Sequence, residues 1–256
     1  MLHVLALLAA TSVEPTVSTA WLQAHLNDPQ VRVIYAGNRD DYDRAHIPGA
    51  RFIDHMDTVG GDHRLLPPEA LATALSKAGA ADGSHVVLYG DRPMETGWLY
   101  MTLAAVGHGD DVSMLDGGIK LWLGEKRPTS TAAAASATGT LTVKPAPDVI
   151  VDAPWVRKRL ESSSTKVLDV RTTQEWNDGH LPGATLILWQ DLYADQRMLK
   201  FKSLWFGATP AVVTYCAVGM RASLMYWAAR TAGIPARVYV GSWQDWQRDS
   251  ANPIVR

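Results

Sequence analysis

The chain has 256 residues, of which 47% are hydrophobic, so it is long enough to bury the core of one large domain or of two small ones. A net charge of −2 and a pI near 6.4 argue against nucleic acid or an anionic membrane as the main partner. The single cysteine excludes an internal disulfide and any metal site built from several cysteines.

Residues 1–16 are predicted to form a leader ahead of the first domain. Their apolar run, Val4–Ala10, is far too short to span a bilayer. It resembles the core of a secretory signal peptide, although no Lys or Arg precedes it and the small-residue cleavage pattern is weak. A frayed N-terminal segment and a misplaced start codon are the alternatives. We expect an exported or periplasmic protein if the run is a signal peptide, and a cytoplasmic one otherwise.

From residue 17 onward the sequence is a duplicated unit. A shift of 134 positions, which places Val17 on Val151, aligns VSTAWLQAHL with VDAPWVRKRL without gaps. VIYAGNRDDYDRAHIPGA then lies over VLDVRTTQEWNDGHLPGA, VVLY over VVTY, and LDGGIKLW over YVGSWQDW. Ser18 and Asp152 coincide and are good N-cap residues for the helices that follow. This order of landmarks indicates two homologous domains, 17–128 and 148–256.

Within each half, short apolar strands alternate with helical patterns such as PPEALATALSKAG. The strands are VRVIYA, HVVLY and VSML, then KVLDV, AVVTY and RVYV, and they are continuously apolar, as in a parallel sheet covered on both faces. We therefore predict an α/β fold of two tandem domains, each a small parallel sheet flanked by helices. Residues 129–147 are rich in Ala, Ser, Thr, Gly and Pro and are predicted to be an interdomain linker.

The duplication provides an internal control, because features shared by both copies are expected to build the fold. His46 and His180 occupy equivalent turns, H-[IL]-P-G-A, so a structural role is favoured over that of a general base. Trp122 and Trp246 are equivalent as well, and we expect them to be packing residues. Features found in only one copy are the better candidates for chemistry.

The second copy carries three groups that the first lacks. Asp169, Arg171 and Cys216 stand where the first copy has Tyr35, Gly37 and Gly90. Arg171 is a candidate substrate-binding residue and Asp169 a candidate supporting residue; the alternative is that the two form a purely structural ion pair. This asymmetry favours the second half as the working site.

Cys216 follows the strand AVVTY and precedes a helix predicted over 221–232 and closed by Gly233. Ligands bind at the carboxyl ends of parallel strands. A tight loop containing Gly219 can turn backbone N–H groups inward as an anion nest, and the helix N-terminus adds positive charge. Arg221 supplies a permanent cation and a planar fork for oxyanions. These groups should stabilise a thiolate or an anionic sulfur species at Cys216, whereas the alternative is a small buried residue.

The stretch CAVGMR resembles the active-site loop of rhodaneses, in which a cysteine opens a six-residue loop at the head of a helix. LDVR, E-W-x-x-G-H-L-P-G-A, VVTYC and R-x-Y-x-G-S-W-Q-D-W agree with the same family in order and spacing. Residues 17–256 look like a tandem-domain sulfurtransferase with an inactive first domain and a catalytic second one. The resemblance implies that Cys216 cycles through a persulfide. It further implies that the terminal sulfur is cradled by the backbone of Ala217, Val218, Gly219, Met220 and Arg221.

The donors known in the family are thiosulfate and 3-mercaptopyruvate. Ala217 and Val218 are neutral, as in many loops that use 3-mercaptopyruvate, whereas Arg221 stands where the best-known members of both groups carry threonine. Glu175 stands where some thiosulfate enzymes have a second substrate-binding arginine. We favour thiosulfate, because Arg221 can clamp a sulfonate bidentately, and keep 3-mercaptopyruvate as the alternative.

The resemblance implies no metal or organic cofactor. The expected partners are a small anionic sulfur donor and an acceptor that is cyanide, a thiol or a thioredoxin-like protein. We expect a monomer that binds neither nucleic acid nor membrane. Four aromatic residues of the second half either line an acceptor pocket or belong to the core or the domain interface: Trp189, Trp205, Phe206 and Trp243.

Two other functions use the same features. A phosphatase or arsenate reductase also pairs a cysteine with an arginine, but its loop usually has five residues between them, and here there are four, Ala217 to Met220. A smaller ring suits one sulfur atom better than a tetrahedral phosphate. The second alternative is a non-catalytic rhodanese-like binding module, which would require an inaccessible thiol.

Overall fold

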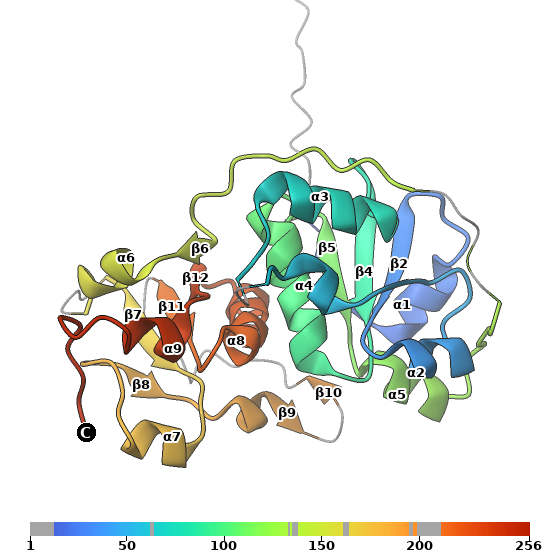
Figure 1. The fold of residues 1–256 in the computed structure, drawn as a ribbon. Helices are drawn as coiled ribbons and strands as arrows, with labels where there is room; N and C mark the ends of the chain where they lie inside the picture. Colours follow the sequence, from blue (N-terminus) through green and yellow to red (C-terminus); the bar gives the residue numbers. More distant parts are fainter. Residues whose placement is uncertain are drawn as a thin grey trace, which may run out of the picture.

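The computed structural model describes residues 13–61, 64–132, 134, 138–160, 164–194, 197–198 and 211–256. Residues 1–12 of the predicted leader, together with Trp205 and Phe206, lie outside the described residues. The described chain forms two α/β halves that lie side by side (Figure 1). The predicted fold class, two tandem parallel-sheet domains flanked by helices, is confirmed.

The first half is built on a five-stranded parallel sheet of order β1-β5-β4-β2-β3. In that order the strands are Thr16–Val17, Val112–Leu115, His85–Tyr89, Val31–Ala36 and Arg51–Ile53. The α-helices are α1 Thr19–Ala24, α2 Arg39–Arg44, α3 Pro68–Lys77, α4 Pro93–Ala105 and α5 Gly118–Gly124, and the 3-10 helix η1 is His55–Thr58.

The second half repeats this topology with a five-stranded parallel sheet of order β6-β12-β11-β7-β8. In that order the strands are Ile150–Val151, Ala236–Tyr239, Val212–Tyr215, Lys166–Asp169 and Thr185–Leu186. The α-helices are α6 Ala153–Arg157, α7 Thr173–Asn177, α8 Met220–Thr231 and α9 Ser242–Trp246, and the 3-10 helix η2 is Trp189–Leu192. A small antiparallel pair, β9 Tyr193–Ala194 and β10 Arg197–Met198, follows η2.

Local sequence explains where these elements begin and why the strands are apolar. The side chains of Ser18 and Asp152 accept the N–H groups of Trp21 and Trp155, so both act as the predicted N-caps. All four residues of β11 are buried, which accounts for its continuous apolar sequence. The helix predicted over 221–232 is α8, and it begins one residue earlier, at Met220, and ends at Thr231.

Helices α4 and α8 lie side by side at the centre of the molecule and join the two halves (Figure 1). A Cβ on Gly97 would lie 2.8 Å from the Cα of Leu224, so the backbones of the two helices approach closely only because residue 97 has no side chain. Leu99 and Met225 belong to one hydrophobic cluster that extends through both halves. The two domains therefore share part of their core, and each has a further cluster of its own.

The segment predicted to be a linker is attached to the first half along its described part. Ser130 and His46 pair through their backbones in an antiparallel bridge. Thr142 binds the carboxylate of Asp82, and Leu141 is only 7% exposed within the shared core. In Figure 1 this segment runs over the first domain before it enters β6. The segment also covers part of the first domain, because apolar and hydroxyl side chains such as Leu141 and Thr142 find partners there.

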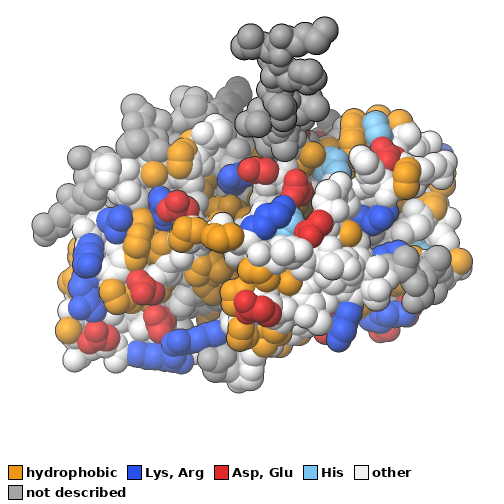
Figure 2. Space-filling model, turned by 90° about the horizontal axis from the view of Figure 1, so that it is seen from above, with side chains coloured by type: hydrophobic (Ala, Val, Ile, Leu, Met, Phe, Trp, Pro, Cys, Tyr) orange, Lys and Arg blue, Asp and Glu red, His pale blue; other side chains and the backbone are white. Residues whose placement is uncertain are grey.

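The surface seen from above mixes charges of both signs. Figure 2 shows Lys and Arg side chains interspersed with Asp and Glu over the described part of this face. No helix in the described part of the chain is long and apolar enough to cross a membrane.

Candidate active site

Cys216 lies directly after β11, a central strand of the second sheet, and opens the four-residue loop 216–219 that leads into α8. Gly219, the N-cap of α8, has a φ of 94°. A Cβ there would lie 2.9 Å from the carbonyl oxygen of Val240 and 3.2 Å from the ring of Trp98, so both the conformation and the space require glycine. Trp98 belongs to the first domain, so this domain packs against the loop at Gly219.

The loop folds back around the sulfur. The Gly219 N–H donates to the Cys216 Sγ at 3.1 Å, which is the inward turn of a backbone donor expected of an anion nest. Cys216 is fully buried, whereas Ala217 is partly exposed and Val218 is 44% exposed, so the loop reaches the surface just beyond the sulfur. Backbone N–H groups of α9 bind the first two carbonyl oxygens of the loop. The Trp243 N–H donates to the Cys216 oxygen, and the Gln244 N–H donates to the Ala217 oxygen.

Ser242 is a site residue that the sequence analysis missed. Its hydroxyl accepts the Cys216 N–H at 3.1 Å and donates to the Tyr239 carbonyl at 2.8 Å. Its φ is 53°, the same value as Gly118 has at the equivalent position of the first copy. A serine in a left-handed conformation is strained, and such strain concentrates at functional sites. The glycine-to-serine difference between the two copies was the available signal.

Arg221 forms a bidentate ion pair with Glu175. Its two terminal nitrogens each donate to one carboxylate oxygen at 2.7 Å. Glu175 is held in place by Thr172, with which it forms a capping box at the start of α7. The hydrogen bond from Arg221 is the largest cause that lowers the pKa of Glu175 to about 2. Glu175 was noted in the sequence only as a departure from the family, and its contact with Arg221 depends on the fold.

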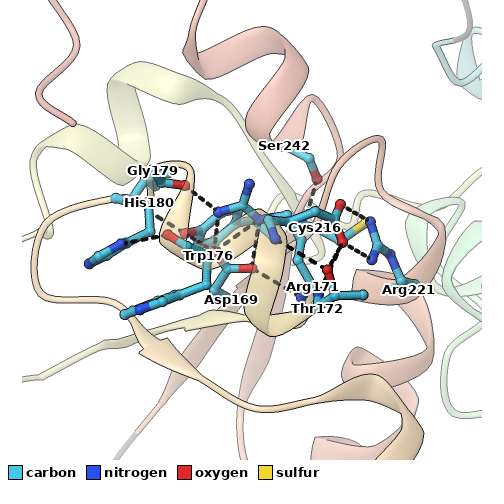
Figure 3. Close-up of polar contacts among 12 residues, drawn as sticks. Asp169, Arg171, Thr172, Trp176, Gly179, His180, Cys216, Arg221 and Ser242 are labelled. Carbon is cyan, nitrogen blue, oxygen red and sulfur yellow. Dashed lines mark hydrogen bonds and ion pairs between the residues drawn. The ribbon is translucent and has the colours of Figure 1, made fainter. Parts of the chain in front are cut away.

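Arg221 also lies close to the sulfur. Figure 3 shows its guanidinium next to Cys216. The pKa of Arg221 is raised mainly by its hydrogen bond to Glu175 and further by its interaction with Cys216. The cation predicted for the loop is therefore present, but both of its terminal nitrogens are engaged by a carboxylate.

Arg171 and Asp169 form a fully buried pair beneath the loop (Figure 3). Arg171 donates to both oxygens of Asp169 and to the carbonyl of Gly179 at 2.7 Å. The hydroxyl of Tyr215 donates to the same carboxylate, and the Trp243 ring lies 4.6 Å from the guanidinium carbon. These contacts favour the structural alternative for Arg171 over substrate binding. Trp243 belongs to this packing as well.

The two equivalent histidines make the same contacts. His46 stacks on Tyr42 and places Nδ1 2.8 Å from the Tyr42 carbonyl oxygen. His180 stacks on Trp176 and places Nδ1 3.1 Å from the Trp176 carbonyl oxygen (Figure 3). Both imidazoles thus hold the turn that follows a short helix, in agreement with the predicted structural role.

The first copy cannot hold an equivalent nucleophile. A Cβ on Gly90 would lie 2.0 Å from the carbonyl oxygen of Ala36, so no side chain fits at this position. The loop before α4 has three residues, 90–92, and the helix begins with Pro93, which lacks an N–H. The second copy has the longer loop with Gly219. Within the described ranges, no group of three or more His, Cys, Asp or Glu side chains is placed to hold a metal ion.

Comparison with known proteins agrees with this architecture. The family model described as the Rhodanese-like domain matches residues 18–125 and 152–249. A thiosulfate sulfurtransferase of Azotobacter vinelandii is 28% identical, with 95% of this chain and 97% of the relative covered. A probable 3-mercaptopyruvate sulfurtransferase of Pseudomonas aeruginosa is 30% identical, with 97% and 95% covered. A solved anaerobic ergothioneine biosynthesis enzyme from Chlorobium limicola superposes with a TM-score of 0.83 at 23% identity, covering 94% of this chain and 69% of that one.

These matches extend over both halves, and they define the class of protein to which the fold and the cysteine loop point. The chain belongs to the rhodanese-like family, as a tandem-domain member. The two relatives named above are sulfurtransferases, and the chain is an enzyme of the sulfurtransferase family.

Proposed function

We propose that the chain transfers a sulfane sulfur from thiosulfate to a thiophilic acceptor through a persulfide on Cys216. The observation that carries the proposal is the Gly219 N–H, which donates to the Cys216 sulfur at 3.1 Å inside a loop at the end of a parallel strand. A donor in this position stabilises negative charge on sulfur, both in the thiolate and in the persulfide. The first copy has the same scaffold without the sulfur, which supports a role for Cys216 beyond packing.

The proposed cycle has two steps. The Cys216 thiolate attacks the outer sulfur of thiosulfate, a new S–S bond forms, and sulfite leaves with the electron pair of the old S–S bond. An acceptor nucleophile, such as cyanide or a thiolate, then attacks the outer sulfur of the persulfide and releases the Cys216 thiolate. With cyanide the product is thiocyanate. No oxidant or reductant is consumed, and a ping-pong kinetic pattern follows.

The role proposed for Arg221 differs from the one expected from the sequence. A bidentate clamp on a sulfonate would use the two terminal nitrogens that Glu175 occupies. We propose instead that Arg221 acts as a fixed positive charge beside the sulfur, held there by Glu175, while backbone N–H groups of the loop hold the donor.

A second donor, 3-mercaptopyruvate, is favoured by specific observations. The exposed part of the loop is neutral at Ala217 and Val218, and the fork of Arg221 is not free for an inorganic dianion. The relatives include enzymes named for either donor. The same persulfide on Cys216 would form, with pyruvate in place of sulfite as the leaving group.

Intact-mass spectrometry after incubation with thiosulfate tests the proposal. We expect the wild-type protein to gain one sulfur atom, to release one equivalent of sulfite, and to lose the added sulfur on addition of cyanide. Cys216→Ser should show none of these changes. A wild-type protein that gains no sulfur from either donor would instead support the non-catalytic binding module, the alternative with which the full burial of Cys216 agrees. Steady-state kinetics with the two donors then ranks them by kcat/KM, and hydrolysis of a generic phosphoester would revive the phosphatase alternative.

A further inference from the structure

The first domain contains a cavity at the position that corresponds to the catalytic loop of the second. Its volume is about 320 Å³, and it is lined by Gly90, Asp91 and Pro93, by Lys120 on α5, and by Trp189 and Gln190 of the second domain. Gly90 is the counterpart of Cys216, and Lys120 is the counterpart of Gln244. The volume lies within the range of small-molecule sites. The duplicated domain has therefore lost its nucleophile and kept a cavity.

Two opposite charges line this cavity without neutralising each other. The Asp91 carboxylate accepts the Tyr35 hydroxyl at 2.9 Å, and this contact leaves its negative charge in place. Lys120 is exposed on α5. Within the described ranges neither residue forms an ion pair, although both border the same space. The neighbouring cation, Arg92, is bound to Glu95 at 3.1 Å.

The remaining walls are apolar or neutral. Trp189 is half-buried and presents an aromatic surface, Pro93 adds an apolar ring, and Gln190 offers an amide. Gly90 contributes backbone to the wall, and the side where a Cβ would lie faces the carbonyl oxygen of Ala36. A simple anion would be attracted by Lys120 but repelled by Asp91. A simple cation would be attracted by Asp91 but repelled by Lys120. A ligand carrying both charges satisfies both residues.

We propose that this cavity binds a free α-amino acid, with its ammonium group on Asp91, its carboxylate on Lys120 and its side chain against Trp189. One amino acid fits within the volume, and it bridges the two charges that the protein leaves apart. The site is separate from Cys216 and does not depend on the sulfur-transfer chemistry. It gives the inactive first domain a binding role, with one wall supplied by the second domain.

Isothermal titration calorimetry of full-length Cys216→Ser protein with L-methionine tests this site, because the probe is a zwitterion and its thioether accepts no sulfane sulfur. We expect saturable binding that weakens about tenfold or more in Asp91→Asn and in Lys120→Gln, since each loses one charge contact. The exposed Lys158→Gln in the second domain is the matched control and should bind as the parent does.

Two analogues show which charge meets which residue. L-Methionine methyl ester has no carboxylate, so Lys120→Gln should leave its affinity unchanged while Asp91→Asn weakens it. N-Acetyl-L-methionine has no ammonium group, and the two substitutions should exchange their effects. Both analogues should bind the parent protein less tightly than L-methionine does, so the charge requirement is tested even if a variant fails to fold. Three results would overturn the proposal: no binding at about 10 mM probe, which exceeds even a weak millimolar Kd; affinities that do not change in Asp91→Asn and Lys120→Gln; or displacement of the probe by thiosulfate.

Discussion

At the scale of single residues, the second domain carries around one sulfur several side chains that the first domain lacks. Cys216 is buried, its own N–H is held by Ser242, and its sulfur accepts the Gly219 N–H. Arg221 stands beside it and is fixed by Glu175. Each contact joins residues distant in sequence, except the one within the loop. The site therefore depends on backbone geometry as much as on the identity of the cysteine.

Ser242 combines a strained backbone with a hydrogen bond to Cys216, and two substitutions separate these effects. Ser242→Gly removes the strain of a left-handed conformation, which costs a non-glycine residue roughly 1–2 kcal/mol. The same substitution loses the hydrogen bonds of the Ser242 hydroxyl, which contribute about as much. The free energy of unfolding of this variant should therefore stay within about 1 kcal/mol of wild type. Ser242→Ala keeps the strain and loses the hydrogen bonds, so it should be less stable than Ser242→Gly by about 1 kcal/mol or more. Both variants should lower kcat, because both leave the Cys216 N–H without its hydroxyl acceptor.

Urea unfolding and single-turnover sulfur transfer measure the two properties of the Ser242 variants. Equal stabilities of the two variants would show that the φ of 53° carries no strain. An unchanged kcat in both would show that the Cys216 N–H needs no fixed acceptor.

The Glu175–Arg221 pair makes stability depend on pH in a defined window. The pKa of Glu175 is about 2 in the folded protein, below its ordinary value of 4.5, so its ionised form stabilises the fold. This contribution is fully present above pH 4.5 and is lost as the pH falls towards 2. Glu175→Gln should therefore be less stable than wild type at pH 6, by about 1–2 kcal/mol after allowance for solvent screening, and the gap should shrink by pH 3.

Equilibrium unfolding of the wild type and Glu175→Gln at pH 6 and pH 3 checks this expectation, and the difference between the two proteins cancels the titration of other carboxylates. Asp178→Asn, on the same stretch of chain, is a control that leaves Arg221 paired. A stability gap that stays constant or widens at low pH would contradict the ion pair as the source of the shift.

At the scale of elements, α8 has two tasks, because its N-terminus carries Arg221 and its body packs on α4 of the other domain. Gly97 makes the close contact with Leu224, and the next residue, Trp98, lies against Gly219 of the catalytic loop. The Trp98 indole is fixed by its N–H, which donates to Thr58 at 2.9 Å. The first domain thus determines where the Cys216 loop and its helix lie.

Gly97→Ala tests this contact. Its new Cβ would lie 2.8 Å from the Cα of Leu224, so α4 and α8 must separate, at a cost of about 1–3 kcal/mol in stability. Because α8 carries Arg221, sulfur transfer should slow as well. Thermal unfolding and turnover with thiosulfate measure the two effects.

Gly124→Ala is the matched control for Gly97→Ala, since nothing lies within 4 Å of a Cβ built at Gly124. It should change stability by no more than about 1 kcal/mol, in either direction, and leave turnover unchanged. Equal behaviour of the two variants would show that the close approach at Gly97 is not required.

At the scale of the whole molecule, the two halves share a topology, and part of their core is common to both. The segment after residue 128 also packs on the first domain through residues such as Leu141. The two halves are therefore joined by packing along the described part of the chain, which contains one cysteine, Cys216. The cavity beside Gly90 lies in the first domain and has a wall supplied by the other domain.

The sequence by itself determined the duplication, the α/β class and the family, and it predicted Cys216 as the reactive residue. These depend on apolar strand patterns, on capping residues such as Ser18 and on order along the chain, all of which are local or repeat at a fixed offset. The contrast between Cys216 and Gly90 could be predicted in the same way, because the two residues align at equivalent positions of the repeat.

Only the tertiary structure decided which partners the site residues have. Glu175 meets Arg221 across 46 positions, Ser242 meets Cys216 across 26, and Arg171 turns to Asp169 instead of the loop. The sequence gives the charge of a side chain, but the neighbours of that side chain depend on how separate strands and helices pack. The sequence therefore identified the sulfur, and the packing of two domains determined what surrounds it.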